Sequence, residues 1–229
     1  MYLALDTAAP RASLALGDEG GRVVAESSAR IGGRRSEALL PALDALLSAA
    51  KLDPASISAV VVGGGPGSYT GVRIAAAAAK GVVHALGRPL YAHGSLEAMS
   101  AGVEAPERPL MPLLPARREE VYAACHRRAD GRLLEIVPPE LVSLESVIAT
   151  AREHAAVAIG PGAETHALAL RAASVLVDAA LGGRRAAGLL RLHFWRGEAG
   201  RVADPWTWEP VYLRAADPPS GDWDGEPTG

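Results

Sequence analysis

The chain has 229 residues, of which 49% are hydrophobic and 21% are charged, and its formal net charge is −3. This length and composition are typical of a folded protein with one good-sized core or two small ones. The small negative charge argues against tight autonomous binding to nucleic acid or to an anionic membrane, because both need a strong cationic field. We expect the Arg pairs, including Arg184-Arg185, to be solvated surface charge.

The first thirty residues predict the antiparallel edge of a sheet. Residues 2–6 are typical of a short buried strand, residues 11–16 alternate as its hairpin partner would, and residues 22–29 predict a third strand. A dinucleotide-binding fold would instead pass from its first strand directly into a helix.

Helices and strands then alternate up to residue 103. The expected elements are a helix over 36–50, a buried strand over 57–62, a glycine-rich turn over 63–71, a helix over 72–86, a strand over 90–92 and a helix over 95–101. The proline-rich stretch 104–109 is the expected boundary between two domains.

The second half repeats the pattern of strand, Gly-Pro-Gly turn and helix. Strands are expected over 110–114, 120–127 and 157–159, and helices over 143–153 and 163–172. The sequence therefore predicts a domain over 1–103, a smaller domain over 110–215 and a disordered tail over 216–229.

The glycine-rich turn matches no standard phosphate-binding motif. A P-loop needs Lys and then Ser or Thr after its last glycine, but Val72 and Arg73 follow Gly71. Neither the dinucleotide fingerprint nor a hydrolase nucleophile elbow fits, because Ser68 occupies the third glycine position and lacks the flanking glycines. Two alternatives stay open: an anion site at a helix start capped by Thr70, or a close approach of strand and helix.

Few residues are candidates for catalysis or metal binding. Cys125 is the single cysteine, and the six histidines form no pair at i, i+4, so we expect no metal site and no cysteine nucleophile. Asp6, at the end of the first strand, is the best carboxylate candidate. No leader segment and no long apolar run is apparent, so we expect a cytoplasmic protein with no membrane partner.

Several segments together resemble the TsaB (YeaZ) family. The most specific is Gly-Pro-Gly-Ser-Tyr-Thr-Gly-Val-Arg-Ile at 65–74, and the others lie at 3–8, 36–41, 95–98, 117–122 and 209–214. The resemblance implies an α/β, two-domain actin-like fold (the ASKHA, ribonuclease H-like type) with mixed sheets flanked by helices. It further implies a non-catalytic subunit of the complex that makes N6-threonylcarbamoyladenosine at position 37 of tRNAs reading ANN codons.

The family resemblance also carries expectations about partners and cofactors. A TsaD-like transferase and a TsaE-like ATPase are the implied partners, ATP and Mg are used by the complex, tRNA is bound only through the complex, and this chain binds no cofactor. Ser95 and Met99 stand where the catalytic relative has a metal-binding His-x-x-x-His, and Arg35 replaces a histidine common in the family. The residues of the expected vestigial nucleotide-type loop are Asp6, Thr7, Gly65, Gly67, Ser68, Thr70 and Gly71.

The helices over 36–50 and 72–86 are the predicted partner surface. Small residues would let a facing helix approach and leucines would anchor it, and a homodimer is expected when the partner is absent. The predicted interface residues are Leu39, Leu43, Leu46, Arg73, Ala75, Ala78 and Gly81. The alternative is that these faces pack on the chain's own sheet.

Two other functions remain open from the sequence. One is an autonomous nucleotide-dependent enzyme, a small kinase or ATPase of the same superfamily, in which Asp6, Thr7 and the glycine-rich turn hold phosphate and Mg²⁺. The other, a direct tRNA-binding module, is weakened by the net charge.

Overall fold

The first sheet of the protein contains both N-terminal hairpins. The computed structural model describes residues 1–30, 35–117 and 120–213, and the side chains of residues 30 and 35–37 are not among those described. Strands β1 (Tyr2–Asp6), β2 (Arg11–Gly17), β3 (Val23–Arg30), β4 (Ala59–Gly63) and β5 (Leu90–His93) lie in the order β3-β2-β1-β4-β5. The hairpin pairs are antiparallel, whereas β1–β4 and β4–β5 are parallel, which confirms the predicted mixed sheet.

A second sheet repeats this topology. It contains β6 (Leu110–Pro115), β7 (Glu120–Ala129), β8 (Arg132–Ser143), β9 (Val157–Ile159) and β10 (Leu176–Asp178), in the order β10-β9-β6-β7-β8. In each sheet the first strand is central, a hairpin extends to one side and two parallel strands extend to the other. The predicted two-domain actin-like α/β fold is therefore confirmed. The repeated pattern of strand, Gly-Pro-Gly turn and helix reflects this duplicated arrangement.

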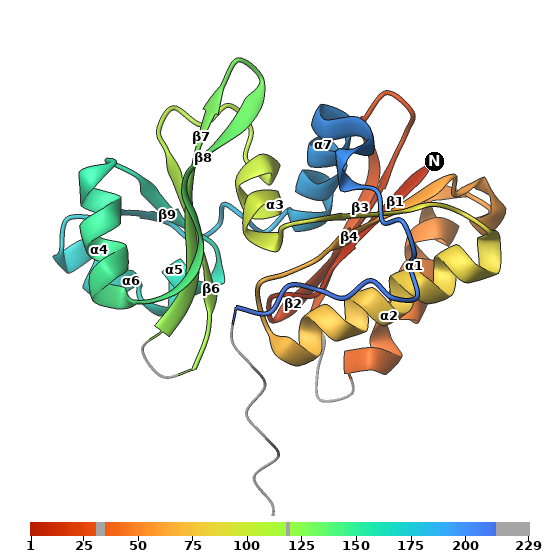
Figure 1. Ribbon diagram of the computed structural model, residues 1–229, viewed down its shortest axis with the longest axis horizontal. Helices are drawn as coiled ribbons and strands as arrows, with labels where there is room; N and C mark the ends of the chain where they lie inside the picture. The colour runs from red at the N-terminus through yellow and green to blue at the C-terminus, as the bar shows by residue number, and fades with distance from the viewer. Residues whose placement is uncertain (31–34, 118–119, 214–229) are drawn as a thin grey trace, which may run out of the picture.

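Helices cover both sheets (Figure 1). Helices α1 (Arg35–Ala50) and α2 (Tyr69–Leu86) lie on one face of the first sheet, while α7 (Arg185–Arg196) contacts β1, β2 and β4 from the other. Helix α3 (Ser95–Gly102) packs against α7 and against the second sheet, which also carries α4 (Leu144–Glu153), α5 (Pro161–Thr165) and α6 (Ala167–Ala172). Two short 3₁₀ turns are Pro54–Ser56 and Gly197–Gly200. Among the described residues, no helix is long and apolar enough to cross a bilayer.

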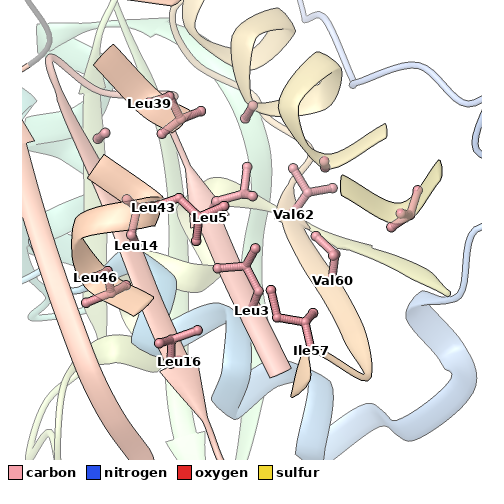
Figure 2. Close-up of a cluster of buried hydrophobic side chains, with 14 of the residues drawn as sticks. Leu3, Leu5, Leu14, Leu16, Leu39, Leu43, Leu46, Ile57, Val60 and Val62 are labelled. Carbon is pink, nitrogen blue, oxygen red and sulfur yellow. The ribbon is translucent and has the colours of Figure 1, made fainter. Parts of the chain in front are cut away.

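Successive side chains along the strands of the first sheet point to opposite faces and so belong to two different hydrophobic cores. Leu3 and Leu5 of β1 face α1 and α2, where they pack with Leu14, Val60 and Val62, as Figure 2 shows. Ala4, between them, faces α7 and belongs to a different cluster. This period of two is what a strand buried on both faces requires.

Helix α7 was not predicted, and it returns the chain to the first sheet. The predicted limits of the second domain, 110–215, stay a prediction, but α7 is the part of that range that packs on the first sheet. The prediction of one helix over 163–172 is corrected to two short helices, α5 and α6. Strand β8 was missed because Pro138 and Pro139 interrupt its pattern, and an edge strand tolerates prolines because it has unpaired positions.

The crossing of α3 and α7 depends on Gly188. A Cβ at this position would overlap the Ala98 carbonyl oxygen and lie 2.8 Å from the Gly102 nitrogen. We expect Gly188→Ala to lower the free energy of unfolding by about 2 kcal/mol despite its better helix propensity. Gly81→Ala in α2, where a Cβ meets no atom of the described residues within 4 Å, is the matched control and should raise that free energy by about 0.5–1 kcal/mol. Urea unfolding measures both, and equal effects of the two variants would contradict the packing.

Candidate functional site

Asp6 is the most highly connected side chain of the predicted site. It is fully buried at the end of β1. Its Oδ1 accepts hydrogen bonds from Ala8 N at 3.0 Å and from Arg185 Nε at 2.6 Å, and its Oδ2 accepts one from Ser95 Oγ at 2.6 Å. Both carboxylate oxygens are therefore bound by donors of the chain itself.

Arg185 supplies the charge that balances Asp6. Its side chain is 4% exposed, and it also donates a hydrogen bond to the Arg11 carbonyl oxygen. The expectation that both arginines of this pair are surface charge is wrong for Arg185, because a buried carboxylate is tolerated only with a charged partner and further hydrogen bonds. Arg184 is half-exposed, as expected, and pairs with Glu26 and Glu104.

The glycine-rich turn brings β4 and α2 against the end of β1. A Cβ on Gly63 would overlap Asp6 Oδ2, and one on Gly71 would overlap the Thr7 carbonyl oxygen. Thr7 Oγ1 donates to the Gly71 carbonyl oxygen at 2.6 Å, which fixes this approach. The turn thus serves the close packing that was one of the two alternatives.

The backbone amides of the turn bind partners within the protein. Gly65 N donates to Ser95 Oγ at 3.2 Å, and Ser68 N donates to the Ala8 carbonyl oxygen at 2.9 Å. The predicted cap Thr70 is wrong: Ser68 caps α2 by accepting from Gly71 N at 3.2 Å, because it directly precedes the helix. These bonds use donors that an anion would need.

The segment 201–213 runs back along α2 and covers the turn. Trp206 contacts the His84 ring near the end of α2, and Tyr212 contacts the Tyr69 ring at its start, both with ring centroids 5.1 Å apart. Val211 N donates to the Gly64 carbonyl oxygen at 2.8 Å. Trp208 packs on the core of the first sheet, so the segment forms a strap that closes the loop from outside.

The predicted partner surface is only partly exposed. Leu39, Leu43, Leu46 and Ala75 are 2%, 8%, 6% and 0% exposed and belong to the core below α1 and α2. The prediction of the three leucines as partner anchors is wrong, since they pack on the chain's own sheet (Figure 2). Ala75, predicted as a small contact residue, is buried in the same core.

Three of the predicted interface residues do reach the outside of α2. Arg73 and Gly81 are exposed and Ala78 is half-buried. The side chain of Arg35 and residues 216–229 lie outside the described residues.

A shallow hollow of about 550 Å³ lies between the outer faces of α1 and α2. Its lining residues are Leu40, Tyr69, Thr70, Arg73, Ile74, Ala77 and Ala78. Leu40 is 54% exposed and Tyr69 is 44% exposed. Arg73 donates a hydrogen bond to the Tyr69 hydroxyl at 2.8 Å and stacks over its ring. Sequence reasoning missed Leu40 because the apolar repeat of α1 does not reveal which leucine faces outward.

The positions compared with metal ligands have structural roles here. Ser95 bonds Asp6, and Met99 is fully buried where the two halves meet, with its methyl group against Gly182. Cys125 is buried too, and burial raises the pKa of its thiol to about 11, which keeps it protonated and unreactive at neutral pH.

A second cavity, of about 390 Å³, lies on the other side of the turn. Gly64, His93, Arg196, Trp208 and Glu209 are among its lining residues. His93 is 5% exposed, and its Nε2 has no hydrogen-bond partner within the described structure. Burial lowers the pKa of His93 to about 4, with contributions from Arg196 and His193. The cavity therefore contains a neutral imidazole at neutral pH.

Removing one partner of the buried ion pair should destabilise the fold. We expect Arg185→Met to lower the free energy of unfolding by about 3–5 kcal/mol, because it leaves Asp6 buried without its counter-charge. Arg184→Met, at the neighbouring exposed arginine, is the control and should cost less than about 1 kcal/mol. Chemical denaturation distinguishes the two, and similar costs for both variants would contradict the assignment.

His93 should make the fold sensitive to mild acid. Between pH 6.5 and 4 the unfolded chain binds a proton on this residue that the folded chain does not, so stability is lost as the pH falls. We expect His93→Asn to reduce the loss of unfolding free energy between pH 7 and pH 5 by about 2 kcal/mol relative to wild type. His84→Gln, at an exposed histidine, is the control. Unchanged pH dependence in His93→Asn would refute this origin.

Comparison with known proteins agrees with this geometry. The family model for TsaD, described as tRNA N6-adenosine threonylcarbamoyltransferase, matches residues 25–174. The chain is 35% identical over 142 residues to the tRNA threonylcarbamoyladenosine biosynthesis protein TsaB of Bacillus subtilis, an alignment that covers 62% of each protein. It is also 36% identical to an uncharacterized protein of Mycobacterium tuberculosis over 67% of this chain and 74% of that one.

A solved structure is similar over almost the whole chain. YeaZ from Pseudomonas aeruginosa superimposes with a TM-score of 0.77 at 28% identity, covering 93% of this chain and 99% of the other. Sequence, family model and fold agree: the chain belongs to the TsaD family, and within it to the TsaB (YeaZ) group of the actin-like superfamily.

Proposed function

We propose that this chain is a non-catalytic subunit in the synthesis of N6-threonylcarbamoyladenosine at position 37 of tRNAs reading ANN codons. The observation that carries the proposal is that hydrogen bonds from Arg185 and Ser95 occupy the two carboxylate oxygens of Asp6. Ligands of α/β sheets bind outside the carboxyl ends of the strands, so a strand-end carboxylate that takes part in a reaction must be free to meet a ligand. Here that group serves the fold, so the reaction belongs to a partner.

The proposed partner is a TsaD-like transferase subunit that docks on the hollow between α1 and α2. Because this chain itself matches the TsaD family model, such a partner has a related fold and carries equivalent helices. Two related surfaces can then pair about a pseudo-twofold axis. Ala77 and Gly81 on the outer face of α2 are small, so a partner helix can approach closely. Leu40 and Tyr69 supply exposed apolar area beside them.

The same surface also accounts for a homodimer, whereas the other assignments come from the family. Without the transferase, a second copy of this chain covers the exposed apolar residues as a homodimer. A TsaE-like ATPase joins the assembly, ATP and Mg are used there, and tRNA is bound through the complex in the cytoplasm. These assignments rest on membership of the TsaB group.

The rival function, an autonomous kinase or ATPase, would need Asp6 as a free carboxylate, but both of its oxygens are bonded within the protein. Titration calorimetry of the isolated chain with ATP and Mg²⁺ should therefore give no saturable binding. Micromolar binding together with turnover would overturn the non-catalytic assignment.

A charge introduced in the hollow should break the proposed docking. We expect Ala77→Arg to weaken binding to the transferase subunit at least tenfold, because it places a long cation beside Arg73 on an apolar contact surface. Ala149→Arg, at an exposed alanine of α4 on the other half of the molecule, is the matched control. Surface plasmon resonance measures both, and wild-type affinity of Ala77→Arg would exclude this face.

The function itself is tested by reconstitution. Transfer of the threonylcarbamoyl group to tRNA by the transferase and ATPase subunits should require this chain and should fall with Ala77→Arg but not with Ala149→Arg. Full transfer in the absence of this chain would contradict the proposal.

A further inference from the structure

Three potential metal ligands meet where α3 lies against the second sheet. His126 of β7 and Glu135 of β8 are direct cross-strand partners, and Glu97 comes from α3. One ligand atom from each of these residues lies within 4.8 Å of the other two. Figure 1 shows α3 between the β7–β8 hairpin and α7, so the cluster joins the two halves of the molecule.

His126 has the features of a metal ligand that is already oriented. It is 1% exposed, its Nδ1 is 2.9 Å from Ser100 Oγ, and its Nε2 is buried with no hydrogen-bond partner among the residues that the structure describes. A buried polar atom without a partner is rare, because it loses its hydration without compensation. When Nδ1 carries the proton and donates it to Ser100, Nε2 keeps a lone pair for a metal ion.

The imidazole is also in the protonation state that a metal requires. Burial lowers the pKa of His126 to about 4, an effect that Glu97 opposes and Arg196 supports. At neutral pH the ring is therefore uncharged, and no proton has to be displaced from its free nitrogen.

We propose that Glu97, His126 and Glu135 bind a divalent transition-metal ion of the Zn²⁺ type, which clamps α3 to the β7–β8 hairpin. One imidazole nitrogen and two carboxylate oxygens suit Zn²⁺ better than Mg²⁺, which prefers oxygen ligands and water. Tetrahedral ligands at metal–ligand distances of about 2.0–2.1 Å lie roughly 3.4 Å apart. Glu135 is exposed, so its side chain can close the remaining distance.

The local charge balance allows a cation despite a neighbouring arginine. Arg196 forms two hydrogen bonds to Glu97, at 3.0 and 2.6 Å. Each carboxylate oxygen retains a further lone pair for a metal ion. Two carboxylates and one guanidinium leave one net negative charge at the site, so a divalent ion is still attracted. Arg196 also holds Glu97 in place from the α7 side.

The site is not predictable from histidine spacing, because its ligands come from three separate elements. The sequence expectation of no metal site relied on the absence of helical histidine pairs. The proposal is independent of the docking surface on α2, which lies on a different part of the molecule. The proposed ion has a structural role: it connects the two halves of the molecule.

Zn²⁺ titration of the full, tag-free chain tests the proposal. By calorimetry we expect one saturable site in the wild type, at least tenfold weaker binding in Glu135→Gln, and wild-type binding in Glu140→Gln. Glu140 is an exposed glutamate of the same strand and gives a matched loss of charge. Mg²⁺ should not compete. Equal affinity of Glu135→Gln and wild type, or no saturable site in the wild type, would overturn the assignment.

A spectroscopic readout identifies the ligand directly. In ¹⁵N-detected histidine spectra, Zn²⁺ should shift the Nε2 resonance of His126 and leave its Nδ1 protonated. Melting temperature should rise with Zn²⁺ concentration in the wild type and Glu140→Gln, because an ion that binds only the folded chain stabilises it. An unchanged His126 resonance in the presence of saturating Zn²⁺ would exclude this residue.

Discussion

The ion pair between Asp6 and Arg185 connects the parts of the chain on which the remaining structure depends. Asp6 ends the central strand of the first sheet, and Arg185 begins the helix that covers that sheet's far face. Ser95, the first residue of α3, bonds the other carboxylate oxygen. A single buried carboxylate therefore fixes β1, α3 and α7 relative to one another, and a buried charge of this kind is stable only while all its donors remain.

This arrangement determines what the glycine-rich turn can do. Gly63 packs directly on Asp6, and the strap over 201–213 bonds the turn from outside through Val211. The turn is consequently enclosed between β1 and the strap. The side of α2 away from the sheet stays accessible, with the exposed apolar residues Leu40 of α1 and Tyr69 of α2 beside it. The interior thus holds the fold together, and the proposed contact with a partner lies on the outside of two helices.

Much of the fold follows from local sequence patterns. The N-terminal hairpins, the buried strand before the turn and the helices of the first half have clear periodicity, and their positions were predicted to within a few residues. Helical spacing could not tell which leucines of α1 face inward, since Leu39 and Leu40 are adjacent and equally apolar. Burial of Arg185 was also unpredictable, because its partner lies 179 residues earlier in the chain. The cluster of Glu97, His126 and Glu135 was unpredictable for a similar reason, because its members come from three separate elements that only the fold brings together.

The central claim is that Asp6 serves the fold and not the chemistry. The most direct measurement is threonylcarbamoyl transfer to tRNA in the reconstituted system, using a chain in which Asp6→Asn and Arg185→Met are combined so that neither charge is left alone. With folding verified by circular dichroism, the account predicts transfer at close to the wild-type rate. Loss of transfer by a folded double variant that still binds the transferase subunit would contradict it.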